Sequence, residues 1–155
     1  MRQRTVLRLR HFDYSSGRLY LVTACARGRR CLFGEVVADA VRLTRIGTLV
    51  RDQIEALPER LGAEVDLFVV MPNHVHAIVD LSARVRARQA SPLPLGTVVG
   101  SFKSGSSREA GTLLWQRGYH DHIVRDEPDL ERVREYIATN PIRWALDPEN
   151  PARRS

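Results

Sequence analysis

The chain contains no long apolar run and few cysteines. None of its 155 residues lies in a run of about 18 apolar residues, so no membrane-spanning helix is expected. The N-terminal MRQRTVLRLRH lacks the apolar middle and the small-residue cleavage site of a signal peptide, and we therefore expect a cytoplasmic protein. Cys25 and Cys31 are too few for a disulfide framework or a zinc knuckle, and both are predicted to be packing residues.

Lysine and aromatic residues are also scarce. Lys103 is the single lysine among 24 Lys and Arg, and the formal net charge is +6 at pH 7. Because the planar guanidinium of arginine can hold phosphate oxygens through two hydrogen bonds at once, this composition favours nucleic acid as the partner. A GC-rich coding sequence would also raise the arginine content. Aromatic residues make up 6%, and the strands lack the aromatic-rich signature with which RRM domains stack bases.

Nothing in the sequence indicates a second domain. A hydrophobic content of 43% is enough for one core, no internal repeat is present, and we predict a single domain over residues 1–155. Residues 82–94 (SARVRARQASPLP) mix arginine, serine and proline without apolar periodicity, which predicts a mobile basic loop. Arg84, Arg86 and Arg88 in this loop are candidate DNA contacts.

The hydrophobic pattern predicts the order strand, helix, strand, strand, helix, strand, helix. The strands are expected at residues 19–26, 65–71, 75–81 and 113–124, and the helices at residues 35–57, 95–105 and 126–140. The first helix is predicted because apolar residues from Val36 to Leu57 step by three and four. This order predicts an α+β fold of the ferredoxin-like or RRM-like kind, with four to five antiparallel strands and helices packed mainly on one face.

The stretch MPNHVHAIVDL places two histidines in a predicted strand. Side chains of a strand alternate between its two faces, and one face here is wholly apolar and should meet the helices: Val75, Ala77, Val79 and Leu81. His74 and His76 project from the opposite, exposed face, about 6 to 7 Å apart. Such a pair could share a metal ion or a phosphate, or could only hydrogen-bond its neighbours. A catalytic metal would need a third protein ligand and an open position.

The last predicted helix offers that third ligand. Tyr136 and Asn140 lie four residues apart on the edge of its apolar stripe, so their side chains are stacked one turn apart. The Asn140 oxygen could complete a site for Mg²⁺ or Mn²⁺, with Tyr136 beside the phosphate that the cation polarises. Alternatively, Tyr136 packs at the rim and Asn140 ends the helix before Pro141.

Other polar residues are weaker candidates. His120 and His122 in YHDH form a second pair, interpreted as substrate contacts or as a structural pair, and Lys103 is a further candidate DNA contact. Tyr119 is a rival nucleophile, although its shared parity with Trp115 and Ile123 predicts burial.

Several stretches resemble the REP-associated tyrosine transposases, which are single-tyrosine transposases of the HUH endonuclease superfamily. They are MPNHVH, SFKS, LLWQRGYHDHIVRDEPDLERVREYIATNPIRW and the N-terminal LRHFDYSSGRLYLVTACARGRRCLFGEV, so the resemblance covers nearly the whole chain. By position it implies that His74 and His76 are the HUH pair, that Asn140 assists with the metal, and that Tyr136 is the nucleophile.

The resemblance also implies an activity. It is a single-stranded DNA endonuclease and strand transferase that uses Mg²⁺ or Mn²⁺ and cleaves near hairpin or palindromic repeats through a covalent 5′-phosphotyrosine, as a monomer or a homodimer. Two alternatives remain open at this point. One is a non-catalytic, domesticated protein that binds hairpin DNA, and the other is a metal-dependent phosphodiesterase that uses water as nucleophile.

Overall fold

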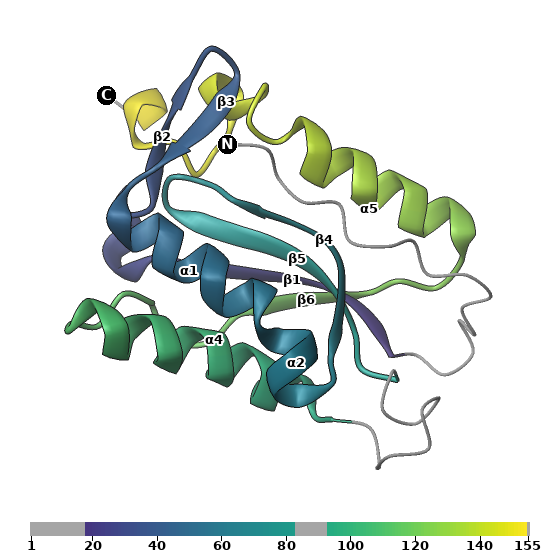
Figure 1. The fold of residues 1–155 in the computed structure, drawn as a ribbon. Coiled ribbons are helices and arrows are strands. Elements are labelled where there is room, and N and C mark those ends of the chain that lie inside the picture. Colours follow the sequence, from purple (N-terminus) through teal and green to yellow (C-terminus); the bar gives the residue numbers. More distant parts are fainter. Residues whose placement is uncertain (1–17, 83–92, 155) are drawn as a thin grey trace.

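The computed structural model describes residues 18–82 and 93–154, and its centre is a four-stranded antiparallel sheet between two helical layers (Figure 1). The order across the sheet is β4-β5-β1-β6. The strands are β1 (Leu19–Cys25), β4 (Glu64–Val70), β5 (His74–Asp80) and β6 (His120–Ile123). The predicted α+β fold with an antiparallel sheet is therefore confirmed.

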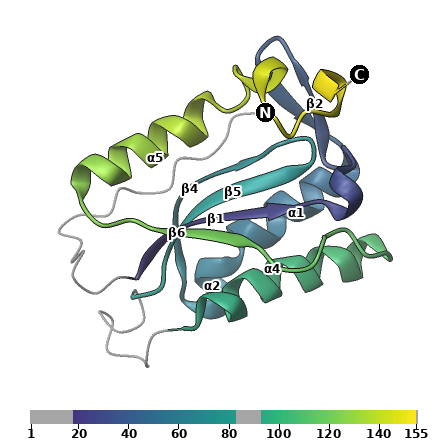
Figure 2. The same cartoon turned by 180° about the vertical axis from the view of Figure 1, so that it is seen from behind.

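Three helices cover one face of the sheet and one covers the other (Figures 1 and 2). The first layer consists of α1 (Arg45–Glu55), α2 (Leu57–Leu61) and α4 (Leu95–Ala110), and the second is α5 (Glu127–Thr139). Short 3-10 turns cover Arg27–Arg29, Trp144–Leu146 and Pro151–Arg154. Among the helices in the described ranges, none combines the length and the apolar character needed to cross a membrane.

Each face of the sheet has its own apolar core. Val75, Ala77 and Val79 of β5 pack against the first helical layer, as their parity predicts. Ile78 packs on the other side against Leu130 and other apolar residues of α5. The expectation that this second face is exposed is wrong, because α5 covers it, and every residue of β5 is buried.

The predicted helix over residues 35–57 is wrong in its first half. That half forms a separate two-stranded sheet of β2 (Gly34–Val37) and β3 (Ala40–Leu43), with a turn whose residues Ala38 and Asp39 have positive φ. Thr44 caps α1 by accepting a hydrogen bond from the backbone of Gly47, which fixes where the helix begins. Val36 and Ala40 suit both periods, so apolar spacing alone could not separate a hairpin from a helix.

Two further boundaries differ from the prediction. The helix expected to end at Gly105 continues to Ala110, because Gly105 is a packing residue: a Cβ there would lie 2.1 Å from Gln53 Oε1 of α1. The strand expected over residues 113–124 is interrupted: His120–Ile123 forms a regular ladder with β1, and Trp115 forms an isolated antiparallel bridge with Ala26 at the end of β1. Gly118, with a φ of +80°, lies between the two. The last helix matches the prediction, with Asp126 accepting a hydrogen bond from the backbone of Asp129.

The predictions for the basic loop and the cysteines have different outcomes. Residues 83–92, with Arg84, Arg86 and Arg88, lie outside the described residues, as do residues 1–17. The loop and the single-domain assignment stay predictions. Cys25 is buried as expected, whereas Cys31 is exposed, so the packing prediction is wrong for Cys31.

Candidate active site

Strand β5 directs both histidines of MPNHVH toward the α5 side of the sheet. The rings of His74 and His76 have centroids 4.8 Å apart and meet edge to face at 75°. Only 2% of His74 and 4% of His76 is exposed. The two histidines therefore form a buried pair rather than the exposed pair that parity alone predicts.

The orientation of His74 is fixed by its neighbour Asn73. The Asn73 amide Nδ2 donates to the carbonyl oxygens of Arg29 (3.1 Å) and Glu149 (2.7 Å), so its Oδ1 faces His74 Nδ1 at 2.8 Å. An amide oxygen can only accept, which assigns the proton of His74 to Nδ1 and leaves Nε2 with a free lone pair. The Trp144 ring, 6.1 Å away at 37°, packs beside this imidazole.

Thr23 supports His76 from the adjacent strand. The β1–β5 register pairs the two residues, and Thr23 Oγ1 lies 2.8 Å from His76 Nδ1. The other ring nitrogen, Nε2, is buried and has no hydrogen-bond partner. Burial, together with the neighbouring His74, lowers the pKa of His76 to about 3, and burial likewise lowers the pKa of His74. Both imidazoles are therefore neutral at neutral pH, which is the form that binds metals.

Asn140 brings an oxygen to this pair from the end of α5. Its Nδ2 donates to the carbonyl of Tyr136 at 3.4 Å, and its side chain lies close enough to His74 to favour the protonated imidazole. Its Oδ1 is buried without a hydrogen bond of acceptable geometry. In the described part of the chain, His76 Nε2 and Asn140 Oδ1 are the buried side-chain atoms left without a partner. Such orphaned atoms are costly unless a ligand satisfies them.

Tyr136 stands beside the histidines on the last turns of α5. Its ring centroid lies 5.1 Å from that of His76 at 66°, and 40% of the residue is exposed. The guanidinium carbon of Arg143 lies 5.2 Å from the Tyr136 ring centroid, and Arg143 Nη2 donates to the Tyr136 carbonyl at 3.3 Å. The ring is thus held between an imidazole and a guanidinium, with its edge accessible from solvent.

The histidines and Tyr136 line one cavity of about 240 Å³. His120 lines it too, because β6 pairs with β1 so that His120 is opposite Thr23. Sequence reasoning missed the remaining lining residues, which lie far from the motifs: Thr23, Cys25, Arg29, Gln116, Asp147 and Glu149. Asn73 lies within the motif MPNHVH, but the sequence alone does not indicate its contact with His74.

The donor set fits a hard divalent cation. No group of three or more His, Cys, Asp and Glu side chains within residues 18–82 and 93–154 is arranged to hold a metal. Asn140 offers an amide oxygen as a third donor, and this oxygen has no hydrogen-bond partner. Two neutral imidazoles and one amide oxygen could bind a divalent cation and would leave coordination positions open for water or a phosphate oxygen.

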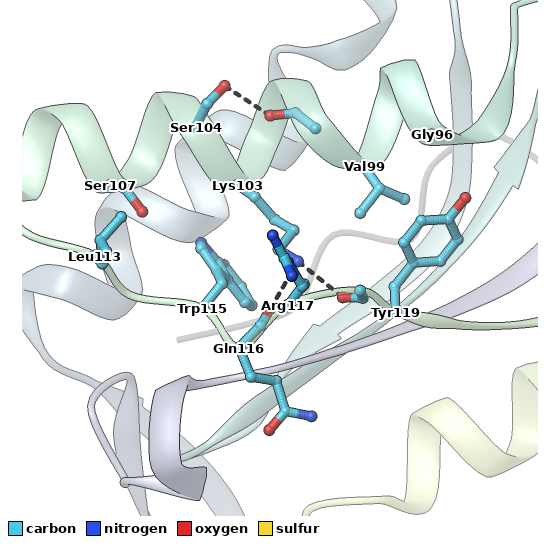
Figure 3. A pocket seen from close by; sticks show the side chains of 12 residues that line it. Gly96, Val99, Lys103, Ser104, Ser107, Leu113, Trp115, Gln116, Arg117 and Tyr119 are labelled. Carbon is cyan, nitrogen blue, oxygen red and sulfur yellow. Dashed lines mark hydrogen bonds between the residues drawn. The ribbon is translucent and has the colours of Figure 1, made fainter.

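The other candidates are held apart from this cavity. His122 Nε2 lies 2.9 Å from the Asp129 carboxylate at the start of α5, in a structural contact. Lys103 lies on α4 and donates to the carbonyls of Gln116 (2.9 Å) and Gly118 (2.8 Å), as Figure 3 shows. Tyr119 is 36% exposed, so the expected burial is wrong, and it lines a different cavity from the histidine pair.

This chain is similar to several known proteins. A sequence profile of the family described as "Transposase IS200 like" matches residues 19–140. An uncharacterized protein of Haemophilus influenzae is 33% identical over 93% of this chain and 91% of its own length. A "Putative REP-associated tyrosine transposase" of the same organism is 23% identical over 84% of this chain and 74% of its own.

A solved structure shares the fold. It is a REP-associated tyrosine transposase bound to a REP hairpin, with a TM-score of 0.64 and 20% identity. The match covers 90% of this chain and 74% of that one.

Proposed function

Because this chain belongs to the family of IS200-like transposases, we propose that it cuts and rejoins single-stranded DNA through Tyr136. Family membership supports a transposase role in DNA processing, and the resemblance read from the sequence motifs agrees with it. We further propose that Tyr136 is the nucleophile, that the intermediate is a covalent 5′-phosphotyrosine, and that the reaction requires a divalent cation.

One observation supports the proposal most strongly. The buried side-chain atoms left unpaired in the described structure, His76 Nε2 and Asn140 Oδ1, belong to two residues from distant elements that both contact Tyr136. A structural role would have satisfied these atoms with protein partners. Because these atoms lie near the solvent-accessible phenol of Tyr136, they favour a site in which a bound ligand supplies the missing partners.

His74, His76 and Asn140 would hold the cation, with Thr23 and Asn73 fixing the ring orientations. A bound Mg²⁺ or Mn²⁺ supplies Lewis-acid polarisation of the scissile phosphate. The neutral imidazoles need no deprotonation before they bind it.

The chain's own residues position the nucleophile. Tyr136 is packed against His76 and beneath Arg143, so its ring has one preferred orientation at the cavity. In the proposed step the phenol oxygen forms a bond to phosphorus and loses its proton. The bond from phosphorus to the 3′ oxygen breaks, and that oxygen leaves as a hydroxyl after taking up a proton. Because the phosphodiester is kept as a tyrosine ester, another 3′-hydroxyl can reverse the step without ATP.

We propose DNA with hairpin or palindromic repeats as the substrate. The structural relative is described as bound to a REP hairpin, and the net charge of +6 suits a polyanion. Arg84, Arg86 and Arg88 remain predicted DNA contacts on the sequence alone.

A denaturing gel with labelled single-stranded hairpin DNA and Mn²⁺ tests the assignment. Wild-type protein should give a band of protein joined to DNA, which a chelator abolishes. Tyr136→Phe should give none, whereas the matched control Tyr20→Phe, which removes a phenol oxygen from β1, should match wild type. Product with multiple turnover and no adduct would instead identify a hydrolase that uses water. Hairpin binding without cutting would identify a binding protein.

A further inference from the structure

A second, larger cavity lies on the opposite side of the sheet edge. It has a volume of about 580 Å³ and is formed between α4 and the segment 113–119 (Figure 3). This volume falls within the range of small-ligand sites. It is more than twice that of the cavity at Tyr136, and we refer to it as the α4 groove.

One wall of the α4 groove is bare helix backbone. Gly96 and Gly100 are one turn apart on α4 and line the groove. A Cβ atom at Gly100 would meet no atom within 4 Å, so the space above it is open. The facing wall carries aromatic rings, Trp115 and Tyr119, of which Tyr119 is 36% exposed. The Tyr119 hydroxyl lies 3.7 Å from the position of a Cβ at Gly96, so the open part of the groove is the space over Gly100. A bare backbone surface beside an aromatic ring suits a planar guest.

The charged residues of the α4 groove are both cations. Lys103 and Arg117 line it, and no Asp or Glu is among its lining residues. Arg117 is exposed and makes no hydrogen bond or ion pair with the described part of the chain. Lys103 donates two of its three N–H groups to carbonyls of the segment, which leaves one N–H for a ligand. The groove therefore suits an anion that also has a flat apolar part.

The α4 groove and the active-site cavity share a boundary. Gln116 lines both cavities. At the start of β6, Tyr119 lines the α4 groove, and the next residue, His120, lines the active-site cavity. Because β6 is an edge strand, a flexible polymer can pass around it from one cavity to the other. Single-stranded DNA has the required flexibility, flat bases and regular phosphates.

We propose that the α4 groove binds one nucleotide of the single-stranded DNA that flanks the scissile phosphate. Its base stacks on Tyr119 over the backbone of Gly100, and Arg117 contacts the phosphate. This inference rests on the proposed function for its choice of polymer, but binding at the groove can be measured without any cleavage.

The test variant is Gly100→Leu, which fills the groove. An interior helical glycine replaced by leucine gains helix propensity, so folding should be kept or improved, as a thermal melt will show. The matched control is Thr97→Leu, which adds the same side chain to an exposed position of α4 that does not line the groove. Both are placed in a Tyr136→Phe background without divalent cations, so that no strand is cut.

The probes are a fluorescein-labelled hairpin with a single-stranded tail of randomised sequence and the same hairpin without a tail. Fluorescence anisotropy should show Gly100→Leu binding the tailed probe about tenfold more weakly, which is typical of losing one stacked base. Binding of the tailless probe should not change, and Thr97→Leu should bind both probes normally. Arg117→Gln should reduce the slope of log affinity against log salt concentration by about 0.7.

Cross-linking locates the base directly. Tails that carry 5-iododeoxyuridine should cross-link to the peptide with Trp115 and Tyr119, and Gly100→Leu should abolish this product. Equal binding of the tailed probe by Gly100→Leu and Thr97→Leu, or cross-links only outside the groove, would overturn the inference. If wild type forms the tyrosine adduct but Gly100→Leu binds normally, the inference alone fails. If no adduct forms but Gly100→Leu still weakens tail binding, the proposed chemistry fails and the groove assignment stands.

Discussion

Both faces of strand β5 are buried, but only one of them carries a buried polar atom without a hydrogen-bond partner. On the α1–α4 side, Val75, Ala77 and Val79 are enclosed by apolar side chains. On the α5 side, His74 and His76 are enclosed as tightly, yet His76 Nε2 lacks a partner. Burial alone therefore does not mark a functional face. The distinguishing feature is a buried polar atom that the described protein leaves unsatisfied.

Substitutions on the two faces of β5 should differ most in their effect on the formation of the protein–DNA adduct. His76→Ala is expected to lower adduct formation by at least about 100-fold, because loss of a residue that only supports a metal ligand already costs about 10- to 100-fold. The substitution also leaves a cavity and removes the partner of Thr23 Oγ1, so adduct formation is compared per folded molecule, with folding followed by a thermal melt. Mn²⁺ titration calorimetry and the denaturing gel check both parts. A variant that binds Mn²⁺ as wild type does would remove His76 from the site.

Low pH should destabilise the folded protein because it favours protonation of the buried histidines on the α5 side of β5. Burial lowers the pKa of both histidines, that of His76 to about 3, whereas unfolding returns them to about 6.5. The unfolded chain therefore binds protons that the folded chain does not. For His76 this contribution to stability is complete above about pH 6.5 and is lost as the pH falls toward 3, by up to about 1.4 kcal/mol per pH unit.

Urea unfolding at a series of pH values measures this slope. His76→Ala should show a shallower loss of stability than wild type between about pH 6 and pH 4. Identical slopes for the two proteins would mean that His76 is not held neutral by the fold.

The supporting hydroxyl should have an intermediate effect. Thr23→Val keeps the shape of the side chain but removes the partner of His76 Nδ1, and Mn²⁺ affinity should fall by about 10- to 100-fold. Thr23→Ser retains the hydroxyl and serves as the control. If Thr23→Val binds Mn²⁺ as tightly as Thr23→Ser, the hydroxyl does not orient the ring.

A substitution on the apolar face of β5 should have the smallest effect on adduct formation. Val75→Ala should lower the free energy of unfolding by about 2 kcal/mol, through lost burial and the cavity left behind. Its adduct formation per folded molecule should equal that of wild type. Strong loss of adduct from a fully folded Val75→Ala protein would mean that the two faces are not independent.

Local patterns in the sequence predicted the apolar face of β5 and the placement of Tyr136 and Asn140. The alternation from Val75 to Leu81 identified the core face, and the spacing of Tyr136 and Asn140 placed two groups on one side of a helix. These inferences held because each depends on neighbours within one element. The helix expected at residues 35–57 failed because its apolar spacing suits a hairpin as well, and the close approach of Gly105 to Gln53 lies between two helices.

The supporting residues of the site could not be predicted in the same way. Thr23 meets His76 only through strand pairing, 53 residues apart in the chain, and Glu149 reaches Asn73 through its backbone carbonyl. Neither contact leaves a local pattern. The burial of the histidines was missed for the same reason, since it depends on α5 packing over a face that strand periodicity treats as exposed.

Mass spectrometry of the protein–DNA adduct can identify the residue that attacks the DNA. Wild-type protein is incubated with single-stranded hairpin DNA and Mn²⁺, digested with protease and nuclease, and searched for a tyrosine that carries a 5′-linked nucleotide. We expect this modification on Tyr136, and we expect it to require the divalent cation. Attachment to Tyr119 or to any other residue, or strand cleavage with no modified peptide, would contradict it.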